Sequence, residues 1–599
     1  MLPYIAPQTD MLLSLLHIAG GRDLLAASPS SVDEDTLAAL LGEAARLAET
    51  DLAPRLRDSD LSPPTLNDKG VTVGPDMHQA HRLVSENGWI ALPYPEAVGG
   101  LNQPWAISSL MLELADSANV AFALSMCMTQ GCAEAILAHG SQAQIDAYVP
   151  ALINGTYMGT MQLTEASAGS DVGALTTQAT PAEDGSWRLS GTKIYISWGD
   201  SDLADNIVHM VLARTPSARA EARMGTKGLS LFLVPKILPD GTRNSVYPSG
   251  LEHKLGLHGS PTCTMVHEGS VGWLVGQEQG GMAAMFTMMN NARIGVGFQG
   301  LGVSERALQA AQDYAKARVQ GGSAIVHYPD VQRNLGIMKC LTAASRDLGY
   351  SAHVAGDLAR LGGDGAARHQ RRIDLLTPIA KAFMTDAAVE VTNLAIQIHG
   401  GMGVIEETGV AQLARDCRVF TIYEGTNGIQ ALDLAGRKTL RDQGQGVKEL
   451  LADMQATLDE ADLRDADLEE AFSGEDSSGE APSQTAPGLA ALTVPLKKAH
   501  GDVSAAVDWL LVAAAHDPNI LAAAATPYLH ALAYLSAGWG MLKRAMVTQA
   551  RQGTDPDLAR AQRHLALFYT TQLLPRVDAA LVAMRAGSPV LLTMDREQI

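Results

Sequence analysis

The chain has 599 residues, about four times a usual domain length, so several domains or one large composite fold are expected. Hydrophobic residues make up 46% and charged residues 18%, which describes a globular chain and excludes a largely disordered one. The formal net charge of -21 repels phosphate backbones, and no cluster of lysine and arginine offsets it, so nucleic acid is not an expected partner.

The five cysteines are scattered and form no CxxC pair. This pattern argues against a disulfide framework and against a zinc site, and it predicts a reducing, cytoplasmic location. Residues 1–34 are predicted to be an N-terminal leader. The segment contains Asp10 and has no lysine or arginine before Arg22, unlike a signal or transit peptide.

Residues 35–160 predict an N-terminal helical domain, because apolar residues recur at three- and four-residue spacing over 36–56, 78–88 and 108–139. The proline- and glycine-rich segment 92–100 predicts a loop between two of these helices. Residues 161–279 predict a middle β domain, with strands expected at 187–191, 207–214, 228–235 and 262–266.

Helices of bundle length are predicted again within 280–440, at 281–319, 329–361, 374–399 and 408–416. Residues 441–487 predict a helix followed by an acidic linker, since ten acids and only Arg464 lie between positions 459 and 480. Residues 488–599 predict a further helical domain. One of its helices should open at Thr554-Asp555-Pro556, and Pro575 should interrupt the helical pattern.

No apolar run approaches the roughly 20 residues needed to cross a bilayer; the run 509–515 is typical, so no integral membrane association is expected. The segment 295–300 reads GVGFQG and matches GxGxxG, but it follows a helical run rather than a strand. Its glycines are therefore predicted to allow close packing, not to bind a dinucleotide. A metal site would require His253, His258 and His267 to converge with carboxylates, whereas scattered histidines usually satisfy local hydrogen bonds, so no metal site is predicted.

Three segments carry candidate chemistry. The segment 163–171, LTEASAGSD, offers hydroxyl groups and backbone amides to a polar ring edge or a phosphate. The segment 193–199, KIYISWG, ends a predicted strand with aromatic residues around Ser197, which suits a flat cofactor. Glu424 stands before Gly425 and Thr426 at the start of a predicted helix, where a carboxylate is a candidate general base. Each of these segments taken alone is equally typical of an ordinary turn or hairpin.

Taken together, the segments resemble the acyl-CoA dehydrogenase flavoprotein family. Residues 164–171 are similar to its TEPxAGSD loop, 195–197 to its WIT/S segment, 397–401 to its QxxGG turn and 422–426 to its IYEGT catalytic loop. The resemblance covers about residues 35–440 and implies a mainly α fold: a helical domain, a β-barrel and a helical bundle, here with an additional C-terminal helical domain. Residues 4–7, 253–263 and that added domain look most like the long branch with methylthiopropionyl-CoA dehydrogenases and long bacterial fatty acyl-CoA dehydrogenases.

The resemblance implies an FAD cofactor and assigns roles by motif position. Glu424 would remove the α-proton of an acyl-CoA, flavin N5 would accept the β-hydride, and Arg293 would support Glu424. Thr164 and Ser197 would hydrogen-bond the flavin ring, and Gly169 and Ser170 would face its diphosphate. The remaining cofactor contacts implied by the motifs are Met161, Leu163, Ile196, Arg318, Gln397, Gly400, Gly401 and Thr426, of which Arg318, Gln397, Gly400 and Gly401 would reach the FAD of a second subunit.

The sequence departs from the family pattern at four positions. Ala166 replaces a proline, Tyr195 a tryptophan and Gly428 a polar residue that often touches adenine. Ala292 stands where some relatives carry the base, which leaves Glu424 as the candidate. The resemblance implies trans-2-enoyl-CoA formation from a fatty acyl-CoA or 3-methylthiopropionyl-CoA in fatty acid β-oxidation, a homodimer or higher oligomer, and electron-transferring flavoprotein as acceptor. The alternatives are an oxidase that uses oxygen and a DNA-associated flavoprotein of the same fold.

Overall fold

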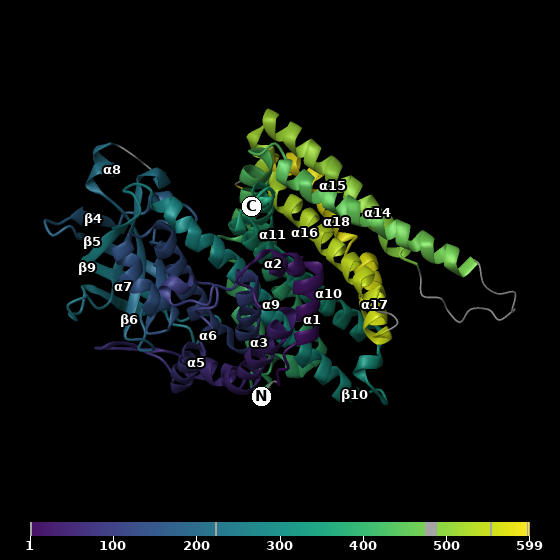
Figure 1. Ribbon diagram of the computed structural model, residues 1–599, viewed down its shortest axis with the longest axis horizontal. Helices are drawn as coiled ribbons and strands as arrows, with labels where there is room; N and C mark the ends of the chain where they lie inside the picture. Colours follow the sequence, from purple (N-terminus) through teal and green to yellow (C-terminus); the bar gives the residue numbers. More distant parts are fainter. Residues whose placement is uncertain (1–2, 222–224, 474–487, 551–553, 596, 598–599) are drawn as a thin grey trace. The chain divides into compact units, whose positions relative to one another are not determined.

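The computed structural model describes residues 3–221, 225–473, 488–550, 554–595 and 597. The chain forms two compact units, which are described separately. The first contains residues 1–8, 28–310 and 395–424, and the second contains residues 9–27, 311–394 and 425–599. Each unit is therefore assembled from three separate stretches of sequence, whose colours can be followed in Figure 1.

The first unit opens with helices. Asp33 caps α3 by accepting a hydrogen bond from the backbone N–H of Thr36 at 2.8 Å. The α-helix predicted over 36–56 is interrupted, because α3 gives way to a π turn over Ala48–Leu52 and a 3-10 turn over Ala53–Arg55, where Pro54 lacks an amide hydrogen. The helices that precede the sheet are α3 (Glu34–Leu47), α4 (Leu56–Leu61), α5 (Pro75–Glu86), α6 (Trp105–His139) and α7 (Gln142–Ile153).

Helix α6 is buried along most of its length and breaks at Asn119, whose φ of -154° and ψ of 87° are not helical. The side chain of Asn119 accepts a hydrogen bond from the N–H of Phe122 at 3.3 Å and so caps the second half of α6. Within the described residues, α6 and α16 (Pro518–Gln549) are long and apolar enough to cross a membrane, and 89% and 56% of their most apolar windows are buried inside the protein. Counting uninterrupted apolar runs missed both helices, since single polar residues break a run without removing its apolar character.

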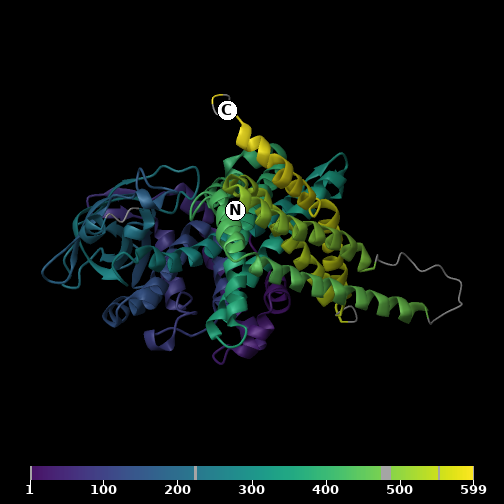
Figure 2. The same cartoon turned by 90° about the horizontal axis from the view of Figure 1, so that it is seen from above.

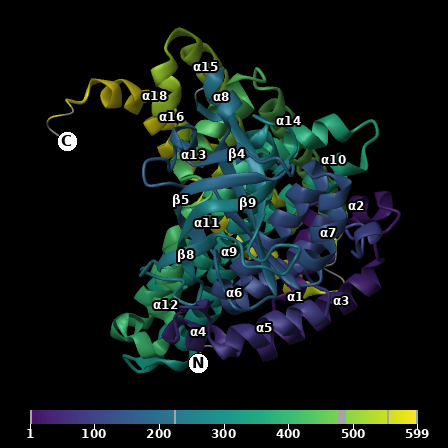
Figure 3. The same ribbon diagram turned by 90° about the vertical axis from the view of Figure 1, so that its left-hand side faces the viewer.

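The middle strands close into a small barrel, as predicted. Strands β4, β5, β9, β7 and β6 follow one another around a ring that the β6–β4 contact completes, while β3 pairs with β6 and β8 pairs with β9. Figure 3 shows β4, β5 and β9 side by side. The barrel strands are β3 (Tyr157–Gln162), β4 (Gln178–Pro181), β5 (Trp187–Ser197), β6 (Asn206–Arg214), β7 (Leu229–Pro235), β8 (Val246–Leu251) and β9 (Thr262–Val275).

Alternate residues of these strands fill the barrel core, including Leu189, Val211, Phe232, Val234 and Met265. Helix α6 packs against β3. Helix α9 (Gly281–Ala317) begins in the first unit and ends in the second. The other elements of the first unit are β1 (Thr65–Asn67), β2 (Gly70–Thr72), α8 (Pro216–Ala220), α12 (Val410–Cys417) and 3-10 turns at Glu96–Val98, Val172–Ala174, Gly225–Gly228, Gly400–Val404, Glu406–Thr408 and Arg418–Thr421.

The second unit is helical. Its elements are α1 (Gln8–Leu12), a π turn (Leu13–Ile18), α2 (Gly21–Ala27), the hairpin β10 (Val319–Gln320) with β11 (Ser323–Ala324), a 3-10 turn (Ile325–His327), α10 (Pro329–Leu361), α11 (Ala366–His399), α13 (Asn427–Leu432), a π turn (Asp433–Leu440), α14 (Gln445–Ser473), α15 (Ala490–His516), α16, α17 (Pro556–Gln572) and α18 (Arg576–Thr593). Figures 1 and 2 show α14 and α15 running alongside each other.

The C-terminal boundaries follow the predicted signals. Asp555 caps α17 by accepting a hydrogen bond from Leu558 N at 3.0 Å, and α18 starts directly after Pro575. The acidic linker is wrong over 459–473, because α14 continues to Ser473; the rest of the predicted linker, 474–487, lies outside the described residues. The helix persists since Leu458 and Ala461 bury an apolar face despite the neighbouring acids.

A buried group of charges connects three stretches of the second unit. Arg544 of α16 donates to both carboxylate oxygens of Asp347 at 2.7 and 2.8 Å, and Ser14 donates to Asp347 at 2.6 Å. Lys339 pairs with Asp10 at 2.5 Å. Burial raises the pKa of Asp10, but Lys339 and Arg544 outweigh it and hold that pKa well below its usual value. The N-terminal residues, α10 and α16 are thus joined by paired charges rather than by apolar packing alone.

Candidate active site

Glu424 lies in a turn whose backbone is held in an uncommon conformation. Its φ is 55° and that of Gly425 is 86°, so two successive residues occupy the left-handed region. This region suits glycine but costs a residue with a Cβ about 1 kcal/mol or more. The side chain of Glu424 is partly buried. A strained, non-glycine residue at this point is typical of a functional position.

The turn before Glu424 is fixed from α9. The hydroxyl of Tyr423 donates to the side-chain oxygen of Gln299, and the Tyr423 ring stacks on Phe420 with centroids 6.1 Å apart. Burial raises the pKa of Tyr423 well above its usual value, with further contributions from Cys127 and Asp116 of α6. The phenol therefore stays protonated and acts as a donor.

Helix α6 contributes two buried titratable groups near this turn, the carboxyl of Asp116 and the thiol of Cys127. Asp116 is buried, and neither carboxyl oxygen has a hydrogen-bond partner among the described residues. Burial, and then Glu113, raises the pKa of Asp116 well above its usual value. Burial likewise raises the pKa of the Cys127 thiol, followed by the charges of Asp116 and Glu424. Asp116 and the Cys127 thiol of α6 thus both hold their protons more tightly than usual.

Arg293, predicted to support Glu424, is buried in α9 with 4% of its surface exposed. Its guanidinium lies 5.8 Å from the centroid of the Phe286 ring and donates to Asn290 at 3.5 Å. A buried guanidinium on the helix that also carries Gln299 gives this part of the first unit a positive charge. Its supporting role toward Glu424 stays a prediction.

The loop after β3 is held by a buried ion pair. The carboxylate of Glu165 accepts from Lys193 of β5 at 2.9 Å, and also from the backbone N–H and hydroxyl groups of Thr176 and Thr177 at 2.6 to 3.0 Å. Lys193 also donates to the carbonyl of Leu163 at 3.0 Å. Burial raises the pKa of Glu165, but Lys193 and these hydrogen bonds outweigh it and lower the pKa to about 2.

This anchor leaves the predicted cofactor residues at the surface of the loop. Thr164 is partly exposed, while Gly169 and Ser170 are exposed. The N–H of Ile194 donates to the carbonyl of Thr164 at 3.0 Å, which places the loop beside the predicted WIT/S segment. Met161 is buried in β3 and Leu163 is partly buried.

The predicted flavin segment forms a bulge at the end of β5. The register with β9 shifts between Lys193 and Ile196, and Tyr195 adopts a φ of 60° with 62% of its surface exposed. Ile196 and Trp198 are buried on the opposite side, and Thr160 donates to the carbonyl of Ser197 at 2.8 Å. The bulge re-aims Tyr195 outward, as bulges beside binding sites commonly do.

The QxxGG turn at the end of α11 is open. Gln397, Gly400 and Gly401 are exposed, and a Cβ placed on either glycine would meet no other atom within 4 Å. Gly400 has a φ of 59°. Gly403 is the packed member of this turn, since a Cβ there would lie 2.3 Å from the carbonyl oxygen of Ile396. The two open glycines therefore leave room for a ligand to approach the backbone.

Two predicted residues belong to the second unit. Thr426 caps α13 by accepting from Ile429 N at 3.3 Å, as expected from its place after Gly425. Arg318 is exposed and precedes the short β10–β11 hairpin. Lys381 of α11 donates to the carbonyl of Gly425 and to the side chain of Asn427, both at 2.9 Å. The first turn of α13 is thus fixed by a buried lysine.

Sequence reasoning missed three of these supports. Glu165 and Lys193 lie 28 positions apart, and Lys381 lies more than 40 positions before the turn it holds. One signal was available: Lys381 stands between two alanines inside an apolar helical stretch, where a lysine is buried only if it is paired. Gln299 was read only as part of the glycine motif.

The motifs set aside from the sequence have structural roles. Residues 295–300 lie inside α9, where a Cβ on Gly295 would come within 2.6 Å of the Cys127 sulfur of α6. The predicted close packing of helices at Gly295 is therefore confirmed. His258 binds Asp60 at 2.8 Å and His267 binds Gln162 at 2.8 Å. A search of the described residues found no group of three side chains suited to a metal ion.

Family models cover most of the chain. Residues 34–156, 160–270 and 279–439 match the N-terminal, middle and C-terminal domains of acyl-CoA dehydrogenase, and residues 447–595 match a domain described as acetyl-CoA dehydrogenase C-terminal like. The chain belongs to the acyl-CoA dehydrogenase family. It is an oxidoreductase and a flavoprotein that uses FAD to dehydrogenate an acyl-CoA thioester.

Individual relatives match different shares of the chain. The chain is 37% identical to 3-methylmercaptopropionyl-CoA dehydrogenase of Ruegeria pomeroyi, over 96% of this chain and 97% of that protein. It is 34% identical to a broad-specificity linear acyl-CoA dehydrogenase of Mycobacterium tuberculosis, over 75% and 77%. The solved butyryl-CoA dehydrogenase of Megasphaera elsdenii superposes with a TM-score of 0.58 at 29% identity, over 68% of this chain and 98% of that one.

Proposed function

We propose that Glu424 is the general base of the dehydrogenation. The observation that carries this assignment is its left-handed, partly buried position in a turn that Tyr423 and Gln299 fix beneath it. A carboxylate held in one place can take the α-proton of a bound thioester. The N–H of Glu424 itself is proposed to hold the thioester oxygen.

The cofactor residues are proposed from the arrangement of polar groups in each unit. Thr164 and Ser197 would bind the flavin ring, and Gly169 with Ser170 would bind the diphosphate. Met161, Leu163, Ile196 and Thr426 would line the site. FAD, when bound, supplies the acceptor for the hydrogen removed from the β-carbon. The exposed hydroxyls and the backbone room at Gly400 and Gly401 fit such a group.

The oligomer is proposed to be at least a homodimer. Arg318, Gln397, Gly400 and Gly401 are exposed in the chain, which suits contacts to the FAD of a second copy. The exposed apolar side chains of Met402, Val404 and Ile405 next to the glycine turn also favour burial by another subunit. Gel filtration of the FAD-loaded protein tests this proposal, and a monomer that retains FAD and activity would refute it.

The substrate is proposed to be a short, linear or thioether acyl-CoA, because the relatives include a 3-methylmercaptopropionyl-CoA dehydrogenase and a broad-specificity linear acyl-CoA dehydrogenase. The product would be the trans-2-enoyl-CoA, formed in the cytoplasm as a step of fatty acid β-oxidation, with electron-transferring flavoprotein as acceptor. Anaerobic flavin bleaching with linear, branched, aromatic and thioether acyl-CoAs ranks these substrates.

Glu424→Gln tests the central assignment. The variant keeps the shape of the turn but loses the base, so flavin reduction should fall by about 10²- to 10⁴-fold while the flavin stays bound. Glu407→Gln, at an exposed acid, is the matched control and should reduce flavin at the normal rate. Full activity in Glu424→Gln would refute the role.

A further inference from the structure

The second unit contains a cavity of about 150 Å³. Most of its wall is apolar, from α10, α11 and α14, and includes Leu348, Val354, Ala355, Leu358, Leu376 and Leu450. A cavity of about this volume with such a lining accommodates a benzene-sized molecule. The space therefore suits a ligand with about six non-hydrogen atoms and an aliphatic body.

One cation of α16 lines the cavity. The ammonium of Lys543 donates to the carbonyl of Ile18 at 2.9 Å and lies 4.0 Å from the centroid of the Trp539 ring. An ammonium has three N–H donors, and this carbonyl uses one of them. Across the described ranges, no other acceptor bonds Lys543 and no carboxylate lies within 4 Å of it.

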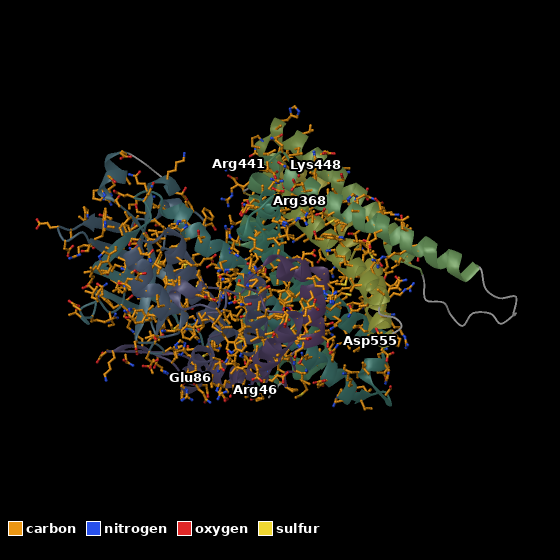
Figure 4. The ribbon with its side chains drawn as sticks, in the orientation of Figure 1. Arg46, Glu86, Arg368, Arg441, Lys448 and Asp555 are labelled. Atoms are coloured by element: carbon orange, nitrogen blue, oxygen red, sulfur yellow. The ribbon has the colours of Figure 1, made fainter. Side chains whose placement is uncertain are left out.

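The other charges of the cavity wall are already paired. Asp347 is bound by Arg544 at 2.7 and 2.8 Å. Arg372 pairs with Asp453 at 2.5 Å, and Arg368, labelled in Figure 4, pairs with the same carboxylate. Positive charge is therefore in excess beside the cavity, because Arg368 and Arg372 share one carboxylate and Lys543 makes no ion pair among the described residues. An unpaired cation beside apolar walls is costly unless an anion or water completes its hydrogen bonds.

We propose that this cavity binds a short aliphatic carboxylate, with its carboxylate on Lys543 and its chain against the leucines and valine of α10 and α11. An anion with a small apolar body satisfies both features at once, through charge-assisted hydrogen bonds and burial of the chain. A purely structural role for Lys543, capping the turn that ends at Ile18, explains one of its hydrogen bonds. That role does not explain the apolar space beside the ammonium.

Occupancy would connect five parts of the second unit. Ile18 and helices α10, α11, α14 and α16 each contribute to the cavity wall, so a bound carboxylate would raise the unfolding temperature of the helices that surround it. The site is made entirely of residues of the second unit and contains none of the groups assigned to thioester chemistry. It is therefore a separate ligand site, suited to an effector.

Calorimetric titration of the FAD-loaded enzyme with butyrate tests the proposal, with butyramide as the uncharged match. Butyrate should bind with a millimolar Kd, as expected for so few atoms, and butyramide at least about tenfold more weakly. Lys543→Met should weaken butyrate binding at least about tenfold, whereas Lys448→Met, at an exposed lysine of α14, should not change it.

A second variant separates loss of binding from loss of folding. Ala355→Leu fills the cavity without altering any charge and should also abolish butyrate binding, while the bound flavin and the helical circular dichroism stay unchanged. Butyrate binding that survives both substitutions, or no butyrate binding by the unaltered enzyme, would overturn the proposal.

Discussion

The ion pair between Glu165 and Lys193 gives the strongest single prediction. Both side chains are buried, with 6% and 0% of their surfaces exposed, and the carboxylate has five donors around it. Glu165→Gln leaves the buried ammonium of Lys193 with neutral acceptors only, the carbonyl of Leu163 and the introduced amide oxygen. Removing one partner of a buried pair costs about 3–5 kcal/mol, so the unfolding temperature should fall on the order of 10 °C.

The opposite substitution should cost less. Lys193→Met leaves Glu165 with the four donors of Thr176 and Thr177, and the expected loss is about 1–3 kcal/mol. The double variant removes both charges and should be more stable than Glu165→Gln alone, because no buried ammonium remains without a carboxylate. This order of stabilities is a direct consequence of which partner keeps other hydrogen bonds.

Thermal unfolding monitored by circular dichroism, together with flavin retention on gel filtration, measures both effects. Glu165→Gln should release flavin, since the same loop presents Thr164, Gly169 and Ser170. Glu183→Gln, at an exposed acid between β4 and β5, is the control and should behave as the unaltered protein. A double variant whose loss equals the sum of the two single losses would refute the reasoning.

Two further predictions concern stability. Burial, and then Lys193, lowers the pKa of His267 from 6.5 to about 3. The neutral form of His267 therefore stabilises the fold above pH 6.5. This contribution is lost as the pH falls from 6.5 toward 3, at about 1.4 kcal/mol per pH unit. His267→Gln should therefore reduce the acid sensitivity of the unfolding temperature between about pH 7 and 5, and an unchanged slope would contradict it. Arg544→Met should lower the unfolding temperature of the second unit by leaving Asp347 without its cation, at a cost of about 3–5 kcal/mol. The measurement is calorimetry beside Arg560→Met, an exposed control, and equal unfolding temperatures would show that the pair contributes nothing.

Local signals in the sequence predicted the long elements well. Helix α10 spans residues 329–361 as predicted, because Pro329 begins it and Gly362 follows its end. Strand β9 is longer than the predicted 262–266, since Glu268 and Gly269 interrupt the apolar pattern while pairing continues beyond them, first with β5 and then with β7. Strand β8 was not predicted at all. Strand β8 forms because it pairs with β9, and the residue pattern within a single segment does not reveal such pairing.

In the candidate site, too, short motifs were predicted from the sequence, whereas the distant residues that hold them were not. The turns around Thr164, Ser197 and Glu424 were found because each is a short motif whose residues are neighbours in the chain. The groups that hold those turns, such as Lys193 and Lys381, come from strands and helices far away in sequence. The sequence does not identify their partners. A charged residue in an apolar stretch indicates that an opposite charge or an acceptor lies nearby, but only the folded structure shows which residue provides it.

The interleaving of the two units bears on how a protein of this design is gained or lost in evolution. Arg544 binds a carboxylate of α10 and a hydroxyl near the start of the chain, so the last helices are not a detachable module. Truncation of the chain after position 440 would leave Asp347 without Arg544. It would also expose the surface of α10 that packs against α16, and the ring of Phe383 in α11 that contacts Tyr534. A shorter chain of this design would need another cation for Asp347 and another partner for the Ser14 hydroxyl.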